Sequence, residues 1–183
     1  ANRSKADSPR GPGLEDGLRR LARGKTETGL PAITDIHEPF HAEKAAGVVD
    51  VIQIPAFLCR QTDLLVAAGE TGKVVSIKKG QWMAPEDMSH AVEKVRRAGS
   101  PEVAVTERGT FFGYGNLVVD MRSFERIRSA AGVPVVFDGT HSVQRPGQAA
   151  GSSGGDPQHI PSLVLAAVAA GCNGLFLETH PTP

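Results

Sequence analysis

Acidic, basic and imidazole side chains follow short apolar runs at several places in this sequence. The clearest case is Val135 to Phe137, followed at once by Asp138 and three residues later by His141. Such groups serve as acids, bases, metal ligands and anion binders. The same order recurs in six segments, which are residues 33–38, 51–56, 74–79, 103–108, 135–141 and 175–180. The polar residues could simply be the solvated first residues of loops. This explains a single segment more readily than six.

Two of these segments end in a cation. Alternate side chains of an extended strand share a face. Lys78 therefore points to the opposite face of its strand from Ile77, and Arg108 to the opposite face from Val105. The aliphatic faces should meet helices, which turns both cations to the other side of the sheet. Ion pairing within the protein is one explanation. Two inward cations with little acid beside them indicate an anionic ligand instead.

A metal site is a further possibility at the same ends of the strands. His141 and Glu178 close two different apolar runs, and both are possible metal ligands. Divalent transition metals usually take three or more protein groups. These two residues alone therefore do not define a metal site.

The elements that must position these groups are strands alternating with helices. The apolar runs are rich in β-branched residues and too short for helices, and segments of helical periodicity separate most of them. This order predicts parallel strands joined by crossover helices, with the polar groups gathered at one edge, as in a (β/α) barrel. The predicted fold class is α/β, a (β/α)8 TIM barrel of which about six βα units are present.

Helices are expected over residues 14–23, 64–70 and 160–170, the last of them buried. Thr62 or Asp63 is the expected cap of the second helix. Residues 109–116 are expected to form an aromatic and glycine-rich loop, and residues 147–159, with almost no apolar content, a flexible lid. Cys59 and Cys172 are expected to be buried free thiols.

Composition narrows the classes of protein. The chain has 183 residues, 40% of them hydrophobic, and no net charge, which does not favour a nucleic-acid or anionic-membrane surface. No apolar stretch is long enough for a transmembrane helix, and no signal-peptide pattern opens the sequence. Two cysteines give no disulfide framework and indicate a reducing compartment. An eight-stranded barrel needs about 250 residues, so residues 1–183 are interpreted as one barrel domain lacking N-terminal strands and a C-terminal segment.

Several long motifs resemble one enzyme family, the 3-deoxy-D-manno-octulosonate 8-phosphate synthases. The motifs are ANRS at 1–4, RGPGLE at 10–15, TDIHEP at 34–39, IQIPAFLCRQTDLL at 52–65, KKGQ at 78–81, TERGTFFGYGNLVVD at 106–120, FDGTHSVQ at 137–144 and LETHP at 177–181. The resemblance covers the whole chain. It implies a cytoplasmic, homotetrameric (β/α)8 transferase that condenses phosphoenolpyruvate with D-arabinose 5-phosphate and water and releases phosphate, in lipopolysaccharide biosynthesis.

The resemblance also assigns roles to residues. Lys78, His141 and Asp35 are the candidate catalytic residues, and Asp35 would contact the sugar. The candidate substrate-binding residues are Gln53, Ala56, Lys78 and Arg108 for phosphoenolpyruvate, and Asn2, Arg3, Ser4 and a neighbouring subunit's Arg60 for the aldose phosphate.

A divalent metal ion is implied for part of this family. His141 and Glu178 match two of its four protein ligands. The other two, a cysteine replaced by asparagine in the metal-independent class and an aspartate, fall outside this chain. The sequences of the motifs KKGQ, TERG and THSVQ are closer to those of metal-dependent members.

Two alternatives remain open from the sequence. The related 3-deoxy-D-arabino-heptulosonate 7-phosphate synthases use erythrose 4-phosphate, although ANRS followed by RGPGLE favours the pentose enzyme. The other alternative is a catalytically inactive barrel fragment that binds phosphosugars.

Overall fold

The fold is α/β, as predicted, with six parallel βα strands. A computed structural model describes residues 11–100, 102–146 and 154–179. The strands are β1 (Ile33–Asp35), β2 (Val51–Ile54), β3 (Val74–Lys78), β4 (Val103–Glu107), β7 (Val135–Asp138) and β10 (Gly174–Phe176). All six coincide with the predicted apolar runs. The chain divides into two compact units, one of residues 1–77 and 91–103 and one of residues 78–90 and 104–183.

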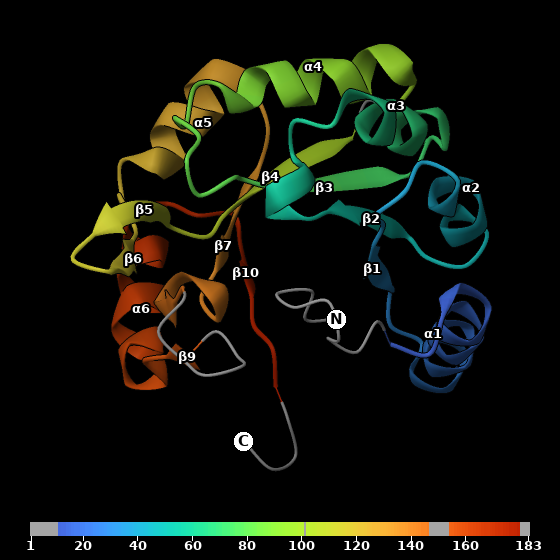
Figure 1. Cartoon of the computed structure of the whole chain (residues 1–183), viewed down its shortest axis with the longest axis horizontal. Helices are drawn as coiled ribbons and strands as arrows, with labels where there is room; N and C mark the ends of the chain where they lie inside the picture. Colours follow the sequence, from blue (N-terminus) through green and yellow to red (C-terminus); the bar gives the residue numbers. More distant parts are fainter. Residues whose placement is uncertain (1–10, 101, 147–153, 180–183) are drawn as a thin grey trace. The chain divides into compact units, whose positions relative to one another are not determined.

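The first unit holds β1, β2 and β3, which pair in parallel in that order. Its helices are α1 (Leu14–Thr28), α2 (His41–Ala46), the 3-10 turn η1 (Ala56–Leu58), α3 (Thr62–Glu70) and most of α4 (Met88–Ala98). Both α2 and α3 pack on β2 and on each other (Figure 1). The sheet side of these contacts is aliphatic, because Ile52 and Ile54 are fully buried. The chemistry-bearing residues are thereby left at the strand ends.

Two helix ends in this unit differ from the expectation. Helix α1 continues to Thr28, and Gly29 ends it in the left-handed conformation with φ 68°. The cap predicted at Thr62 or Asp63 is wrong, because the side chain of Gln61 accepts the hydrogen bond from the backbone N–H of Leu64. Both Thr62 and Asp63 lie inside α3.

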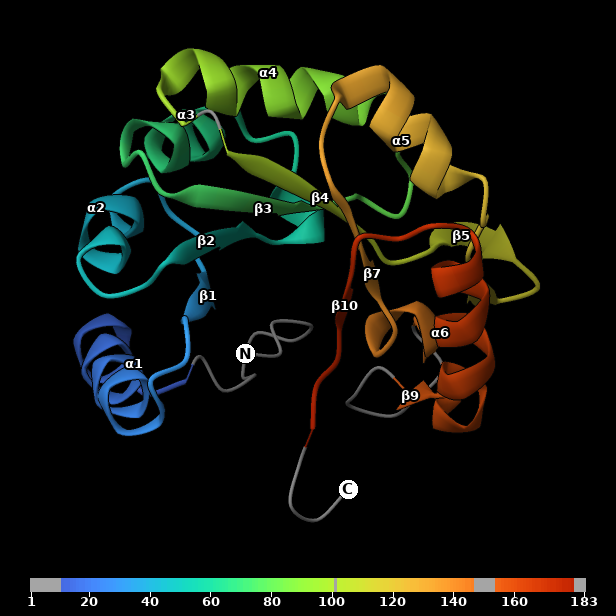
Figure 2. The ribbon, with the colours of Figure 1, turned by 180° about the vertical axis from the view of Figure 1, so that it is seen from behind.

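The second unit holds β4, β7 and β10, which also pair in parallel in that order. Its other elements are β5 (Thr110–Gly113), β6 (Asn116–Val118), α5 (Ser123–Ala131), η2 (His141–Val143), β8 (Gln144–Arg145), β9 (Gly154–Gly155), η3 (Pro157–His159) and α6 (Ile160–Ala169). Helix α5 packs on β7. Figure 2 shows the same unit from behind.

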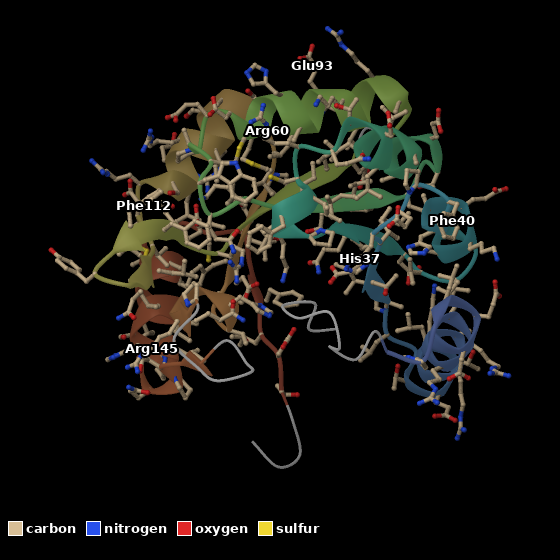
Figure 3. The ribbon with its side chains drawn as sticks, in the orientation of Figure 1. His37, Phe40, Arg60, Glu93, Phe112 and Arg145 are labelled. Atoms are coloured by element: carbon tan, nitrogen blue, oxygen red, sulfur yellow. The ribbon has the colours of Figure 1, made fainter. Side chains whose placement is uncertain are left out.

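The segment 109–116 is an antiparallel hairpin, so the predicted loop is wrong. Strand β5 pairs with β6, and Phe112 and Tyr114 reach the turn with positive φ of 79° and 52°. Phe112 projects outward from this hairpin (Figure 3). Residues with side chains seldom adopt positive φ, and this explains why the sequence reads as an irregular loop. Part of the predicted lid, residues 147–153, lies outside the described residues, whereas residues 154–159 form β9 and η3.

The predicted burial of the last helix is wrong for most of its length. Only Ala167 of α6 is buried, and Leu165 and Val168 are 71% and 54% exposed. Apolar composition shows that a helix favours burial but does not supply the surface that covers it. Cys59 is buried and not in a disulfide, as predicted, whereas Cys172 is only half-buried. Among the described residues, no helix combines the length and apolar character needed to cross a bilayer.

Candidate active site

The second unit contains a group of buried charges at the carboxyl ends of β3, β4 and β7 or directly after them. Among the described residues, five charged side chains are buried, and they are Lys78, Lys79, Glu107, Arg108 and Asp138. Burying charge is costly unless it is paired, and four of these five charges form ion pairs, Lys78 with Asp138 and Lys79 with Glu107.

Lys78 is held by two neighbours. Its Nζ donates a 2.8 Å hydrogen bond to Oδ2 of Asp138, and both groups are buried. The same Nζ lies 3.9 Å from the ring centroid of Phe176 on β10, a cation–π contact. The prediction that the inward cations have little acid beside them is therefore wrong for Lys78. Alternation within one strand cannot reveal a carboxylate that a different strand supplies.

Arg108 has one half of its guanidinium engaged. Nη2 donates to the backbone oxygen of His141 at 3.3 Å and to Oε1 of Gln144 at 2.7 Å. Nη1 is buried and has no hydrogen-bond partner in the described part of the chain. Burial lowers the pKa of Arg108, and the carboxylates of Asp138 and Glu107 oppose that shift. A buried guanidinium with an unused N–H edge is suited to bind an oxyanion.

Asp138 links Lys78 to an imidazole. Its Oδ1 accepts the backbone N–H of His141 at 2.9 Å, and its Oδ2 lies 2.8 Å from Nδ1 of the same residue. Burial acts to raise the pKa of Asp138, but the hydrogen bond from His141 and the charge of Lys78 outweigh it and place the pKa below its ordinary 3.8. Asp138 is therefore an ionised acceptor.

The other imidazole nitrogen faces a second carboxylate. Nε2 of His141 lies 3.4 Å from Oε1 of Glu178, and the backbone N–H of Glu178 donates to Oγ1 of Thr140 at 2.8 Å. A carboxylate on Nδ1 that leaves Nε2 for a metal is the usual setting of a ligating histidine. The donor set thus fits a divalent ion in part. No group of three or more His, Cys, Asp or Glu able to hold a metal occurs in residues 11–100, 102–146 and 154–179.

The remaining candidate residues belong to the first unit or lie outside the described residues. Asp35 on β1 accepts a 2.5 Å hydrogen bond from Nε2 of Gln53, its register neighbour on β2. Oε1 of Gln53 is buried without a described partner. Ala56 is buried in η1, and Arg60 is exposed between η1 and α3 (Figure 3). Asn2, Arg3 and Ser4 fall in the part that the structure does not describe.

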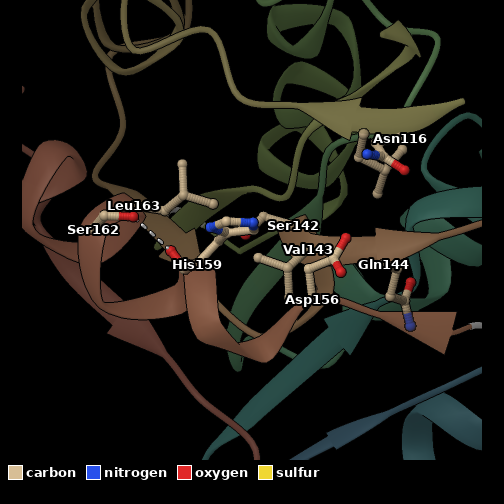
Figure 4. Close-up of a pocket in the computed structure, with 9 residues that line it drawn as sticks. Asn116, Ser142, Val143, Gln144, Asp156, His159, Ser162 and Leu163 are labelled. Atoms are coloured by element: carbon tan, nitrogen blue, oxygen red, sulfur yellow. Dashed lines mark hydrogen bonds between the residues drawn. The ribbon is translucent and has the colours of Figure 1, made fainter. Parts of the chain in front are cut away.

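A small cavity of about 320 Å³ lies beside the η2 turn that follows β7. Figure 4 shows Ser142 and Gln144 lining it together with Asp156 and His159. Gln144 therefore faces the cavity and also bonds to Arg108. The ion pair of Arg145 with Asp156 joins β8 to β9 at the same place.

Sequence reasoning singled out Asp138 at the end of its strand but assigned it no role, and it did not single out Gln144. Both lie inside the recognised FDGTHSVQ motif. The signal for Asp138 was its place at the end of a buried strand, three residues before His141. Gln144 carried no comparable signal, because its role depends on the η2 turn that follows β7.

Parallel βα strands with buried charged side chains at their carboxyl ends place the chain in the α/β class, as a partial (β/α) barrel. The chain belongs to the DAHP synthetase I family, whose profile matches residues 1–183.

Similar proteins within this family share one enzyme name. Over 183 residues the chain is 61% identical to the 2-dehydro-3-deoxyphosphooctonate aldolase of Nitratidesulfovibrio vulgaris, covering 100% of this chain and 67% of that protein. The proteins of the same name from Syntrophotalea carbinolica and Cyanothece sp. are 58% and 55% identical, with 66% and 67% of their lengths covered. The chain thus spans about two thirds of each of these relatives.

Proposed function

We propose that this chain carries the activity of a 3-deoxy-D-manno-octulosonate 8-phosphate synthase. The reaction joins phosphoenolpyruvate, D-arabinose 5-phosphate and water and yields 3-deoxy-D-manno-octulosonate 8-phosphate and inorganic phosphate. Identity of 61% to a curated enzyme of the corresponding name supports the assignment. The structural observation that carries it is the buried cluster of Lys78, Arg108 and Asp138, with its unused Nη1.

Phosphoenolpyruvate brings a phosphate and a carboxylate, so its binding needs cations in a buried setting. We assign Lys78 and Arg108 to this anion, because both are buried and Arg108 keeps one donor edge open. The assignments of Gln53 and Ala56 to phosphoenolpyruvate, and of Asp35, Asn2, Arg3, Ser4 and Arg60 to the aldose phosphate, rest on their motifs.

The chemistry requires two bonds to form and one to break. C3 of phosphoenolpyruvate attacks the aldehyde carbon, water adds to C2, and the C2–O bond breaks with loss of phosphate. Charge on the departing phosphate grows as this bond breaks, and preorganised cations stabilise it without reorganisation. Lys78 and Arg108 supply that field. Asp138 orients the ring of His141, which leaves Nε2 as the reactive nitrogen.

A divalent metal ion is part of the proposal. His141 and Glu178 would contribute to holding it, and Asp138 fixes the ring that presents Nε2. When bound, such an ion supplies Lewis-acid chemistry towards water or a carbonyl oxygen. Metal analysis of the purified protein, compared with a His141→Ala variant, tests the assignment. Equal metal content in the two proteins would contradict it.

A second enzymatic candidate is a 3-deoxy-D-arabino-heptulosonate 7-phosphate synthase, which the description of the matching family favours. Phosphate release from phosphoenolpyruvate, measured separately with arabinose 5-phosphate and with erythrose 4-phosphate, distinguishes the two. We expect release with the pentose. Release with the tetrose alone would overturn the assignment, and release with neither would favour a phosphosugar-binding barrel without catalysis.

The proposal includes a homotetramer and a cytoplasmic location, both implied by the resemblance. Light scattering coupled to size-exclusion chromatography tests the assembly, since a homotetramer has four times the mass of the polypeptide.

A further inference from the structure

A second buried ion pair lies directly behind the two cations of the site. Nζ of Lys79 is 3.5 Å from Oε1 of Glu107, and both side chains are wholly buried. Lys79 follows Lys78, and Glu107 precedes Arg108. Lys79 and Arg108 directly follow β3 and β4, and the backbone N–H of Lys79 still bonds to Thr106 of β4. Neighbouring residues of extended backbone point to opposite faces, so we place the pair on the face away from the site.

Lys79 fixes the backbone that follows β3. Its Nζ donates to the backbone oxygens of Gly80 and Met83 at 3.3 and 3.5 Å and to Oγ1 of Thr110 at 3.3 Å. Its backbone N–H donates to the oxygen of Thr106 at 2.8 Å. An ammonium has three protons, and here these polar partners surround it without contact with the site.

Glu107 fixes the backbone on the other side of Arg108. Its Oε1 accepts the N–H of Gly109 at 2.7 Å, and Gly109 turns with φ 92° into the β5–β6 hairpin. A Cβ at Gly109 would lie 3.2 Å from Cβ of Leu117, so this turn is closely packed. Arg108 therefore lies between Glu107 and Gly109, and the carboxylate of Glu107 bonds to the backbone of Gly109.

We infer that Lys79 and Glu107 are positioning residues, whose ion pair holds Lys78 and Arg108 in the geometry that binds the anionic substrate. The inference rests on the proposed function only for the identity of that anion. Catalytic geometry is sensitive to small displacements, since a misplacement of about 1 Å can cost ~100-fold in rate. Loss of the pair removes neither site cation but releases the backbone on either side of them, so that both can shift.

Simple electrostatics makes a different prediction, and the difference gives the test. Glu107 is an anion close to Arg108. If Glu107 acted only through its charge, Glu107→Gln would strengthen anion binding and Lys79→Met would weaken it. If the pair acts by positioning, both substitutions weaken binding. Glu107→Gln keeps an oxygen that can accept the Gly109 N–H, so it removes the charge of the pair in particular.

The experiment measures phosphoenolpyruvate binding by calorimetry and KM for each substrate in Lys79→Met, Glu107→Gln and the double variant. We expect both single variants to bind phosphoenolpyruvate about tenfold more weakly, with a smaller change in KM for the aldose, and the double variant to be no worse than either. Unchanged or tighter binding in Glu107→Gln overturns the inference. So does an equal rise of both KM values.

Two further variants keep the test decisive if the single variants fold poorly. Thr110→Val removes only one partner of Lys79 and should raise KM for phosphoenolpyruvate by a smaller factor; an unchanged KM counts against the inference. Ile127→Val is a destabilising control at a fully buried residue of α5 and should leave KM unchanged. Calorimetry needs no turnover. Wild-type protein that binds phosphoenolpyruvate but releases no phosphate would therefore contradict the proposed function and leave the calorimetric comparison of the variants intact.

Discussion

Replacement of Arg108 by alanine is the most direct test of the anion site. Arg108 is 5% exposed as a residue, and its guanidinium uses Nη2 for bonds within the protein, to His141 and Gln144. Nη1 is the edge left for a ligand. The variant removes that donor without stranding Asp138, because Lys78 and His141 still bond to it.

The magnitude follows from the contacts. A hydrogen bond to a charged group contributes about 1.5–3 kcal/mol, and about 1.4 kcal/mol corresponds to tenfold in affinity. We therefore expect Arg108→Ala to weaken phosphoenolpyruvate binding by about 10-fold to 150-fold. Arg108→Lys keeps the charge but loses the second donor edge, so its affinity should lie between wild type and alanine.

Isothermal titration calorimetry with phosphoenolpyruvate measures the effect directly, and a melting curve checks that each variant folds. Arg97→Ala is the matched control, because Arg97 is an exposed arginine on α4 that pairs only with Glu93 one turn away in the described structure. It should bind like wild type. Affinity of a folded Arg108→Ala protein within twofold of wild type would refute the assignment of Arg108.

Three further predictions concern stability. In Gly69→Ala, the new Cβ would lie 2.5 Å from the backbone oxygen of Val95, so we expect a loss of about 1–3 kcal/mol in urea denaturation; an unchanged midpoint would contradict this close packing of α3 on α4. Gln61→Ala removes the cap of α3 and should cost about 1 kcal/mol in the same assay, whereas Thr62→Ala should cost less. The hydrogen bond from Arg126 holds the pKa of Glu86 below its ordinary 4.5, so this pair stabilises the fold above that pH and ceases to do so as the pH falls through the lowered pKa. The difference in melting temperature between wild type and Arg126→Ala should therefore shrink from about pH 6 to about pH 3, and a constant difference would exclude the ion pair as its cause.

The strands and the cations at their ends could be predicted from the sequence, because both depend on local pattern. A buried parallel strand is apolar over its length, and alternation decides the face of each side chain. Lys78 and Arg108 follow from this argument, and both are buried at the strand ends. Arg108 also keeps an unused donor, as a cation intended for a ligand should.

The partners of these cations could not be predicted in the same way. Asp138 is 60 residues from Lys78, and Gln144 is 36 from Arg108. Such contacts depend on register between strands, which periodicity within one strand does not contain. The hairpin after Arg108 was missed for a different reason, because its turn places aromatic residues at positive φ, against their ordinary preference.

Charge balance in the buried cluster explains why an anion suits it. Lys78, Lys79 and Arg108 are opposed by Glu107 and Asp138 alone among the buried charges of the described residues, which leaves one positive charge. Lys79 and Glu107 neutralise each other on the face away from the site. Asp138 is then the only buried acceptor that Lys78 has in the described structure, and it is shared with His141. An oxyanion that binds Lys78 competes with Asp138 for the ammonium and leaves the carboxylate more fully to the imidazole. Under the proposed function, the phosphoenolpyruvate site and the face of His141 towards Glu178 would be coupled through this carboxylate, because binding effects between two sites are reciprocal.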